Sequence, residues 1–310
     1  MAIFTTRGYL HPTAPFDFSQ SLHFLERSTA SQEAFFSDNG ILSCTLAVNG
    51  SGVLAQMRSV GSVSEPKLEY RLTSLQPLPE ITRLTALDLL ARFLGLYDNI
   101  SQFYLLARED SRFAPLVEQL YGYHQTTFLS PFSAAVWTLW IQHGSLSDAQ
   151  KRHRVIRELC GPPLPFAGSI YQAFPEPEQV LNAHPERLKL RIRNQDLFEK
   201  LLLLSRYFHW QQDDFWAHAP EAELCKALRE LGLFAPEGIT FFITRGLGRW
   251  DPALLNGQRF VRHYNSIYQQ ENGDNISGIS GSYGNWRHYW AHYLQVSGMI
   301  VRESNTLYRA

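Results

Sequence analysis

Histidine and aspartate side chains are the first candidates for chemistry in this sequence of 310 residues. His288 and His292 are four residues apart, a spacing that places two metal ligands on one helix face, but no third ligand follows at a useful spacing. Asp213 and Asp214 form an acid pair, for which a solvated loop before Pro220 is the alternative. The phosphate-loop, dinucleotide and Gly-x-Ser-x-Gly motifs are missing from the sequence. We therefore expect no metal, no cofactor, and neither nucleotide hydrolysis nor redox catalysis.

The three cysteines are interpreted as ordinary buried residues of a reducing compartment. Cys44, Cys160 and Cys225 include no Cys-x-x-Cys pair, so they build neither a disulfide framework nor a four-thiolate iron–sulfur cluster. The first residues lack the basic-then-apolar order of a signal peptide, and no apolar run approaches the roughly 18 residues of a membrane span. We expect a cytoplasmic protein that has no membrane contact.

Basic side chains cluster locally, although the net charge is -1 and the isoelectric point is about 6.8. Net charge therefore gives no sign of nucleic acid, and any DNA contact must come from a local basic surface. The groups at 151–154 and 187–193 are equally well explained as solvated faces. The candidate cations are Lys151, Arg152, Arg154, Arg187, Lys189, Arg191, Arg193, Arg245, Arg249, Arg259, Arg262 and Arg287.

The elements that must position these residues change type along the chain. Alternating patterns predict strands over 3–9, 42–48, 53–60 and 68–72, with a turn at Asn49-Gly50-Ser51-Gly52 and a helix over 17–26 lying on the sheet. From residue 79 onward the signals are helical almost without interruption, and Ser147 and Asp148 are candidate helix caps. Helices are expected over 79–96, 113–120, 131–142, 147–159, 177–183, 195–208, 221–231, 236–245, 258–268 and 285–299.

Six segments occur in an order that is similar to one family. They are APFDFSQSLHFL (14–25), LLARFLGLYDNISQFYLLAREDSRFAPLVEQLYG (89–122), SPFSAAVWTLWIQHGSLSDA (130–149), FPEPEQVLNAHPERLK (174–189), ITRGLGRWDPALLN (243–256) and YGNWRHYWAHYL (283–294). Together they resemble the helix-hairpin-helix DNA glycosylases, in the branch of bacterial 3-methyladenine DNA glycosylase II.

The resemblance implies an α+β fold, in which an N-terminal antiparallel-sheet domain precedes a two-lobed all-α helix-hairpin-helix region. The implied N-terminal α/β domain covers residues 1–95. One helical lobe, which closes the active-site cleft, combines 96–126 with 245–310, and the lobe that carries the hairpin covers 127–244.

The resemblance also implies an activity. Members of the family flip a modified base out of double-stranded DNA and hydrolyse its N-glycosidic bond, because the base stack hides the reacting atoms. It implies a monofunctional DNA N-glycosylase that leaves an abasic site, and we expect a monomer. The basic groups at 151–154 and 187–193 share one side of the family fold, which favours contact with the DNA backbone.

The catalytic position departs from the family. Counting from Gly248, the family's aspartate falls at Asn256, or at Gly257 if the register shifts by one. An asparagine amide can hold the water but supplies no full charge to an oxocarbenium-like centre. Unrelated thymine and mismatch-uracil glycosylases are similar in using an asparagine, whereas Asn-Gly is also a common turn. Asp251 is the nearest carboxylate, and its family position suggests that it shapes the loop.

The sequence of the hairpin also departs from the family pattern. The family's Leu-Pro-Gly-x-Gly brings backbone N–H groups to a phosphate at a helix N-terminus. Here residues 231–237 read LGLFAPE, so both hairpin glycines are replaced and Glu237 carries negative charge where the phosphate is expected. We expect a weakened phosphate anchor without the metal ion that relatives often hold there.

The wedge and the base pocket complete the expected site. Gln142 and His143 occupy the positions whose side chain fills the gap that the flipped base leaves. Two of the three aligned pocket positions are polar, which favours a neutral polar base over cationic alkylpurines. An inactive relative that binds DNA or another protein is the alternative, and the aromatic residues can equally be core. The expected pocket consists of Glu237, Phe241, Trp250, Tyr289 and Gln295, beside Tyr283, Trp286 and Trp290.

Overall fold

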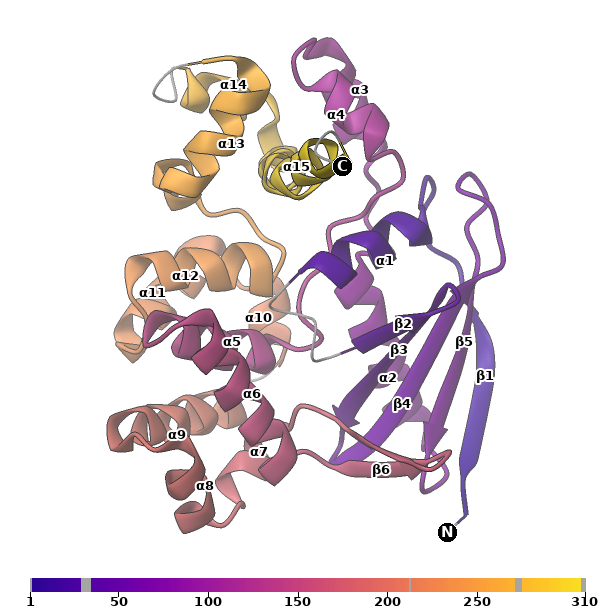
Figure 1. The fold of residues 1–310 in the computed structure, drawn as a ribbon, viewed down its shortest axis with the longest axis vertical. Coiled ribbons are helices and arrows are strands. Elements are labelled where there is room, and N and C mark those ends of the chain that lie inside the picture. Colours follow the sequence, from indigo (N-terminus) through magenta and orange to yellow (C-terminus); the bar gives the residue numbers. More distant parts are fainter. Residues whose placement is uncertain (1, 29–34, 212, 271–274, 308–310) are drawn as a thin grey trace.

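A five-stranded antiparallel sheet begins the fold (Figure 1), in a computed structural model that describes residues 2–28, 35–211, 213–270 and 275–307. Its order is β1-β5-β4-β3-β2, formed by β1 (Phe4–Leu10), β2 (Phe35–Asp38), β3 (Ile41–Val48), β4 (Ser51–Ser59) and β5 (Leu68–Ser74). The β3–β4 turn has only two residues, Asn49 and Gly50, both with positive φ, as tight hairpins require. The four-residue turn expected from the sequence is therefore two residues too long.

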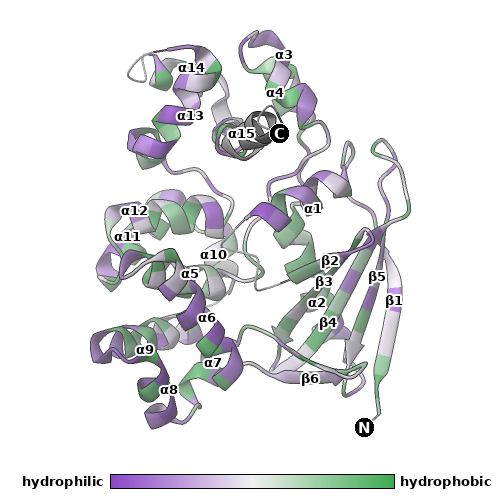
Figure 2. Ribbon diagram, in the orientation of Figure 1, coloured by the Kyte–Doolittle hydropathy of each residue, from purple (hydrophilic) through white to green (hydrophobic). Residues whose placement is uncertain are grey.

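Helices α1 (Phe18–Arg27) and α2 (Glu80–Leu94) accompany the sheet. Asp17 caps α1 by accepting a hydrogen bond from the backbone N–H of Ser19, and α1 buries Phe18, Phe24 and Leu25. Helix α2 packs on β3 and ends at Gly95, which adopts the left-handed conformation that glycine tolerates best. Figure 2 shows hydrophobic residues along α2 and the central strands, as a shared core requires.

The first helical lobe packs onto this domain in one continuous core. It combines elements that are distant in sequence, so that α15 lies between the α3–α4 pair and α13–α14 in Figure 1. Large aromatic side chains, including Phe103, Tyr283 and Trp290, fill its centre. The elements are α3 (Ser101–Glu109), α4 (Ala114–Gln119), α13 (Gln258–Tyr268), α14 (Ile276–Ser282) and α15 (Arg287–Leu307).

The second helical lobe has a core of its own, built around α5 (Pro131–Gln142), whose residues Phe132 to Trp140 are all buried. A π turn (Phe242–Gly246) and a 3₁₀ turn (Pro252–Asn256) lead back to the first lobe. The remaining helices are α6 (Leu146–Cys160), α7 (Pro177–Leu181), α8 (Pro185–Ile192), α9 (Gln195–Trp210), α10 (Asp213–His218), α11 (Glu221–Leu231) and α12 (Pro236–Phe241). The domain boundaries given above stay a prediction.

Several local expectations were wrong. The region after residue 79 contains a β-hairpin, β6 (Pro163–Phe166) with β7 (Ser169–Gln172), which its prolines hide from a strand pattern. Helices α3, α8, α10 and α14 were also missed, and α12 stops at Phe241, where the π turn takes over. Ser145 caps α6, in a capping box with Asp148, instead of Ser147.

Within the described part of the chain, every helix is too short or too polar to span a membrane. The three cysteines are unpaired with one another.

Candidate active site

A cavity of about 530 Å³ lies where the N-terminal domain and both helical lobes meet. Its walls come from the end of α2, the segment 125–131, α10, the loop 246–249 and the start of α15. This volume lies within the range of ordinary small-molecule sites. Sequence segments more than a hundred residues apart therefore surround one space.

Gln125 lines this cavity and is only 5% exposed. Its backbone N–H donates to the Tyr289 hydroxyl (3.2 Å), and its Nε2 donates to the carbonyl of Thr244 in the π turn (3.0 Å). Its side-chain oxygen Oε1 is buried and has no hydrogen-bond partner among the described residues. A buried acceptor left unpaired costs about 1–3 kcal/mol. Gln125 is therefore held on the cavity wall by two hydrogen bonds, and its Oε1 is enclosed by the protein.

Asp98 lies on the same wall and is half-buried. Its carboxylate Oδ2 accepts a hydrogen bond from the Tyr289 hydroxyl. Burial, followed by the negative charge of Asp98, raises the pKa of Tyr289, so this tyrosine stays protonated and donates. Gln125, Tyr289 and Asp98 therefore form a continuous hydrogen-bonded chain along the wall.

A second space of about 10 Å³ adjoins the large cavity, because Gln125, Arg249 and His288 line both. It has room for about one water molecule at most. Trp250 and Gln295, both expected in the base pocket, line this space, and the buried Trp250 Nε1 has no partner in the part of the chain described. The two residues do come together, but the space between them is nearly filled.

Arg249 lines both spaces, and Arg92 is a second arginine on the wall of the large cavity. Its Nη1 donates to the carbonyl of Ala219 (2.7 Å). Burial lowers the pKa of Arg249, and the nearby carboxylate of Glu221 opposes that shift. An arginine keeps its charge even so, so it can contact a phosphate or an electron-rich base edge.

Arg245 and His292 lie in the interior. The Arg245 Nη1 contacts His292 Nδ1 (2.8 Å), and the guanidinium lies over the ring of Phe24. Since arginine only donates, Nδ1 accepts, and the opposite Nε2–H donates to the Tyr123 hydroxyl (2.8 Å). Burial, and then Arg245, lower the pKa of His292. Arg245 is thus engaged internally, away from the DNA-backbone role that the sequence suggested.

Asp251 and Asn256 bound the 3₁₀ turn that follows the cavity wall. Asp251 is buried, and its Oδ1 accepts from the backbone N–H of Ala253 (3.0 Å), so it caps the turn as the loop-shaping expectation requires. Asn256 is exposed at the end of the turn. Leu254, between them, lines the small space beside Gln295. Neither polar residue is among those lining the two spaces.

No protein-family model matches the sequence, and no curated protein matches it. Solved structures are similar over nearly the whole chain. A 3-methyladenine DNA glycosylase from Archaeoglobus fulgidus has a TM-score of 0.74 at 16% identity, covering 93% of this chain and 97% of that one. An 8-oxoguanine glycosylase/lyase from Clostridium acetobutylicum has a TM-score of 0.63 at 12% identity, with coverages of 94% and 97%. MBOgg1 in complex with a low-affinity DNA ligand has a TM-score of 0.68 at 14% identity, with coverages of 97% and 99%.

The chain has the helix-hairpin-helix DNA glycosylase fold. The neighbours include both 3-methyladenine and 8-oxoguanine glycosylases, so the likeness to the 3-methyladenine branch is weaker than the likeness to the superfamily.

The hairpin of this glycosylase fold joins α11 to α12 through Gly232, which is left-handed with φ of 68°. Leu233 and Phe234 are buried, whereas Glu237 is exposed in the first turn of α12 and lines neither space. Phe241, another expected pocket residue, packs instead with its edge against Phe128, which lines the large cavity. Three of the five expected pocket residues, Glu237, Phe241 and Tyr289, therefore lie outside the described cavity walls.

The loop between α5 and α6 holds the expected wedge. Two hydrogen bonds fix the side chain of Gln142. Its Oε1 accepts from the backbone N–H of Ala235 (2.6 Å), and its Nε2 donates to the Thr138 carbonyl (3.1 Å). His143 is exposed, and burial, followed by Lys200, lowers its pKa, so the ring is neutral at pH 7. Leu146, which sequence reasoning did not select, is an apolar side chain with 41% exposure in the same loop region.

The basic residues differ in their exposure. Lys151, Arg154, Arg259 and Arg262 are exposed, whereas Arg152 packs its Nη1 behind Gly144 and has this atom buried. Two cations of α8 contact acids, Lys189 with Glu186 and Arg191 with Glu158, each at 3.1 Å. Arg187 and Arg193 are exposed, and Arg287 is half-buried. Figure 2 shows α8 as a strongly hydrophilic helix.

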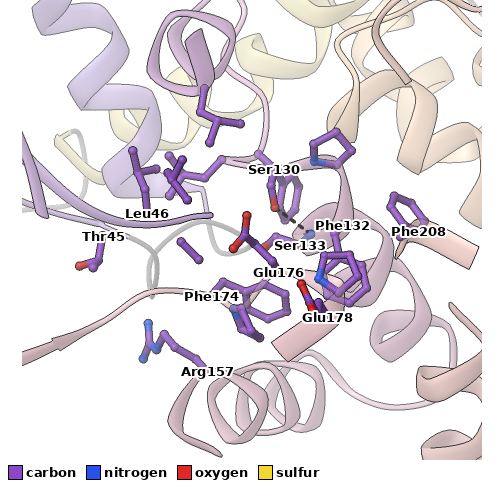
Figure 3. A pocket seen from close by; sticks show the side chains of 18 of the residues that line it. Thr45, Leu46, Ser130, Phe132, Ser133, Arg157, Phe174, Glu176, Glu178 and Phe208 are labelled. Atoms are coloured by element: carbon purple, nitrogen blue, oxygen red, sulfur yellow. Dashed lines mark hydrogen bonds between the residues drawn. The ribbon is translucent and has the colours of Figure 1, made fainter. Parts of the chain in front are cut away.

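A second large cavity, of about 390 Å³, lies behind the first and shares its wall at Leu89, Thr127–Leu129 and Pro131. Figure 3 shows Thr45 and Leu46 of β3 across from Phe132 and Phe174, with Ser130 accepting from the backbone N–H of Ser133 (3.1 Å). Glu176 also lines it and accepts from the backbone N–H groups of Asn49 and Gly50, which ties the sheet to the second lobe.

Sequence reasoning missed Gln125, Asp98 and Leu146. Gln125 and Asp98 lie within the quoted family segments or just after them, but nothing in their neighbourhood marks a cavity wall. Among the described residues, no group of three His, Cys, Asp or Glu side chains could hold a metal ion.

Proposed function

We propose that this protein is a monofunctional DNA N-glycosylase that flips a modified base into the 530 Å³ cavity and hydrolyses its glycosidic bond, leaving an abasic site. The supporting observation is the cavity itself, which lies between the sheet domain and the helical lobes of a glycosylase fold and has Gln125, Asp98 and Arg249 on its walls. A pocket of this size with a few convergent polar groups is the usual form of a ligand site. The glycosylase fold makes a flipped base the fitting ligand.

The cavity favours a polar modified base over a simple alkylpurine. Cationic alkylpurines are attracted to several electron-rich aromatic faces. Here the described walls combine Gln125, Asp98, Arg249 and His288 with few aromatic faces, of which Trp216 is already stacked on Phe208 at 4.4 Å. Hydrogen bonding therefore outweighs stacking in this cavity. The adjoining 390 Å³ space favours a base with a bulky substituent, such as a large modified pyrimidine.

Asn256 is proposed to hold the hydrolytic water through its amide. It is exposed at the end of the 3₁₀ turn, on the loop that leads away from Arg249. Double-stranded DNA is proposed to bind through the exposed cations Lys151, Arg154 and Arg259, whose attraction to phosphates is independent of sequence. The protein acts on duplex DNA without a metal or cofactor in this proposal.

A single assay tests the activity. Duplexes that each carry one modified base, polar pyrimidines in one set and methylated purines in the other, are incubated with the protein and then cleaved with alkali at abasic sites. We expect cleavage in the polar set and little in the methylated purines. Gln125→Leu should reduce release about 10- to 100-fold, since its acceptor is lost. Gln56→Leu, in the sheet, is the matched control.

One alternative has a specific observation in its favour. The catalytic position is uncharged Asn256, and the space between Trp250 and Gln295 is nearly filled. Both features suit a protein that binds DNA through the fold without cutting a glycosidic bond. Tight duplex binding without alkali-labile sites on any modified duplex would replace the glycosylase proposal with this one.

A further inference from the structure

The described walls of the 530 Å³ cavity contain one acidic side chain, Asp98. It belongs to the short loop that follows α2 and begins at left-handed Gly95. The backbone N–H of Asp98 donates to the Gly95 carbonyl (3.2 Å), so the loop folds back on itself. A Cβ on residue 95 would lie 3.0 Å from Asp98 Oδ2 and 2.9 Å from the Gln125 carbonyl. Glycine at this position therefore lets the carboxylate pack close to the wall.

The exposed fractions of the wall residues distinguish the opening of the cavity from its interior. Tyr97 is 60% exposed and Asp98 is half-buried, whereas Gln125, on the same wall, is almost fully buried. A flipped nucleotide stays attached to the DNA backbone outside the protein, so its base enters first and its sugar remains near the opening. The carboxylate of Asp98 is therefore on the side of the sugar, and Gln125 is on the side of the base.

The carboxylate is held in a fixed orientation. The Tyr289 hydroxyl donates to Oδ2, and the same hydroxyl accepts from the backbone N–H of Gln125. Among the described residues, the Tyr289 hydroxyl is the hydrogen-bond partner recorded for the Asp98 side chain, and it binds Oδ2 and not Oδ1. A preorganised charge of this kind stabilises an opposite charge without reorganisation at the moment of reaction.

We infer that Asp98 supplies the negative charge that Asn256 cannot, as a catalytic residue that stabilises the oxocarbenium-like sugar during base release. This inference rests on the proposed function. In the step, the C1′–N bond breaks and its electron pair leaves with the base. The oxygen of a water molecule then bonds to C1′, and the water's proton passes through solvent to the departed base. Asp98 remains an anion throughout and acts through its charge.

The test measures charge recognition separately from turnover. One duplex carries a pyrrolidine abasic-site analogue, whose protonated ring nitrogen mimics the cationic sugar, and a second carries the uncharged tetrahydrofuran analogue. We expect the wild-type protein to bind the pyrrolidine duplex at least about tenfold more tightly, because the carboxylate attracts its charge in a partly desolvated site. Asp98→Asn should abolish this preference, while its affinity for the tetrahydrofuran duplex, which reports folding, stays unchanged.

Matched variants complete the design. Glu109→Gln removes an exposed carboxylate from α3 in the same lobe and should keep the full preference. Asp98→Glu keeps the negative charge but shifts its position, and it should retain part of the preference for the pyrrolidine duplex. Base release by Asp98→Asn should fall about 100-fold or more on any duplex that the wild type cleaves. A pyrrolidine preference that survives in Asp98→Asn, or an equal loss in Glu109→Gln, overturns the role of Asp98. A wild type that shows the preference but releases no base overturns the proposed function instead.

Discussion

Polar groups are paired differently in two regions, the hairpin between α11 and α12 and the wall of the 530 Å³ cavity. In the hairpin, Leu233 and Phe234 are buried in the lobe's core, and the backbone N–H of Ala235 donates to Gln142 within the protein. On the cavity wall, Gln125 Oε1 is buried without a partner among the described atoms, and so is Trp250 Nε1 in the adjoining space. The polar groups of the hairpin are paired within the protein, whereas the cavity wall contains buried polar atoms without a recorded partner.

This difference indicates where binding is maintained. Each unpaired buried group costs about 1–3 kcal/mol, which is a large part of the few kcal/mol by which a domain is stable. Local rules are most often broken at functional sites. Under the proposed function, the cavity holds the base, and the hairpin has a mainly structural role.

The largest expected effect concerns Asn256, at the end of the 3₁₀ turn that follows the hairpin and Trp250 in sequence. Asn256→Ala should reduce base release about 100-fold or more, because the water loses the amide that holds it. The side chain is exposed, so thermal stability and DNA affinity should stay nearly unchanged. Single-turnover release and duplex binding measured on the same preparation check this. Full activity in Asn256→Ala would remove Asn256 from the mechanism.

A second variant at position 256 restores the negative charge that the family has there. Asn256→Asp should be active, and it should extend release to methylated purines, because a second carboxylate stabilises the oxocarbenium centre on poorer substrates. If Asn256→Asp is inactive on all duplexes while still folded, the loop after Arg249 does not approach the sugar.

The next effect concerns how DNA is held without a glycine-rich hairpin. Replacement of Lys151, Arg152 and Arg154 by Ala should weaken binding to all duplexes alike. The slope of log affinity against log salt should flatten by about 2, since each phosphate contact contributes about 0.9 and Arg152 is partly buried behind Gly144. The same change at Arg7 and Arg58 of the sheet and at Lys67, just before β5, is the control. An unchanged slope would show that this surface is only solvated.

The fold was accessible from sequence because its signals are local and repeated. The strand pattern predicted β1, β3, β4 and β5 but missed β2, and the expected helices over 131–142, 221–231 and 258–268 agree with α5, α11 and α13. Short elements were missed where the local sequence is atypical of the structure that it forms. Prolines conceal β6, and α8 is a charged helix of eight residues that we interpreted as a basic run.

The site was less accessible because its decisive contacts are long-range. Gln125 becomes distinctive only when Tyr289 and Thr244, both more than 100 residues away, occupy its other polar atoms. Asp98 is an ordinary loop acid in sequence, and its proximity to α15 decides its environment. Arg245 is the opposite case. Its position beside the expected site in the sequence suggested contact with DNA, but its guanidinium contacts His292 in the interior.

A smaller effect concerns the loop between α5 and α6. Leu146→Ala and His143→Ala should each lower base release about tenfold while changing binding to unmodified duplex little, because a wedge acts on the flipped state. Both side chains are exposed, so stability should be nearly constant. Leu190→Ala, an exposed leucine on α8, is the control. Equal losses in release and in unmodified-duplex binding would indicate a general DNA contact instead of a wedge.

The smallest effect returns to the hairpin, at Glu237. This carboxylate is exposed in the first turn of α12, where a helix favours negative charge by about 0.3–1 kcal/mol, so Glu237→Gln should lower the melting temperature slightly. If the hairpin still lies along a phosphate backbone, the same change removes a repulsion and should tighten duplex binding about two- to threefold at low salt, with no gain at high salt. The two effects have opposite signs, so general damage to the fold cannot mimic the result. Glu223→Gln, in the first turn of α11, gives the matched control with the stability cost alone. Binding that stays unchanged in Glu237→Gln would mean that the hairpin has left the DNA interface altogether, which would sharpen its contrast with the cavity to a complete division of roles.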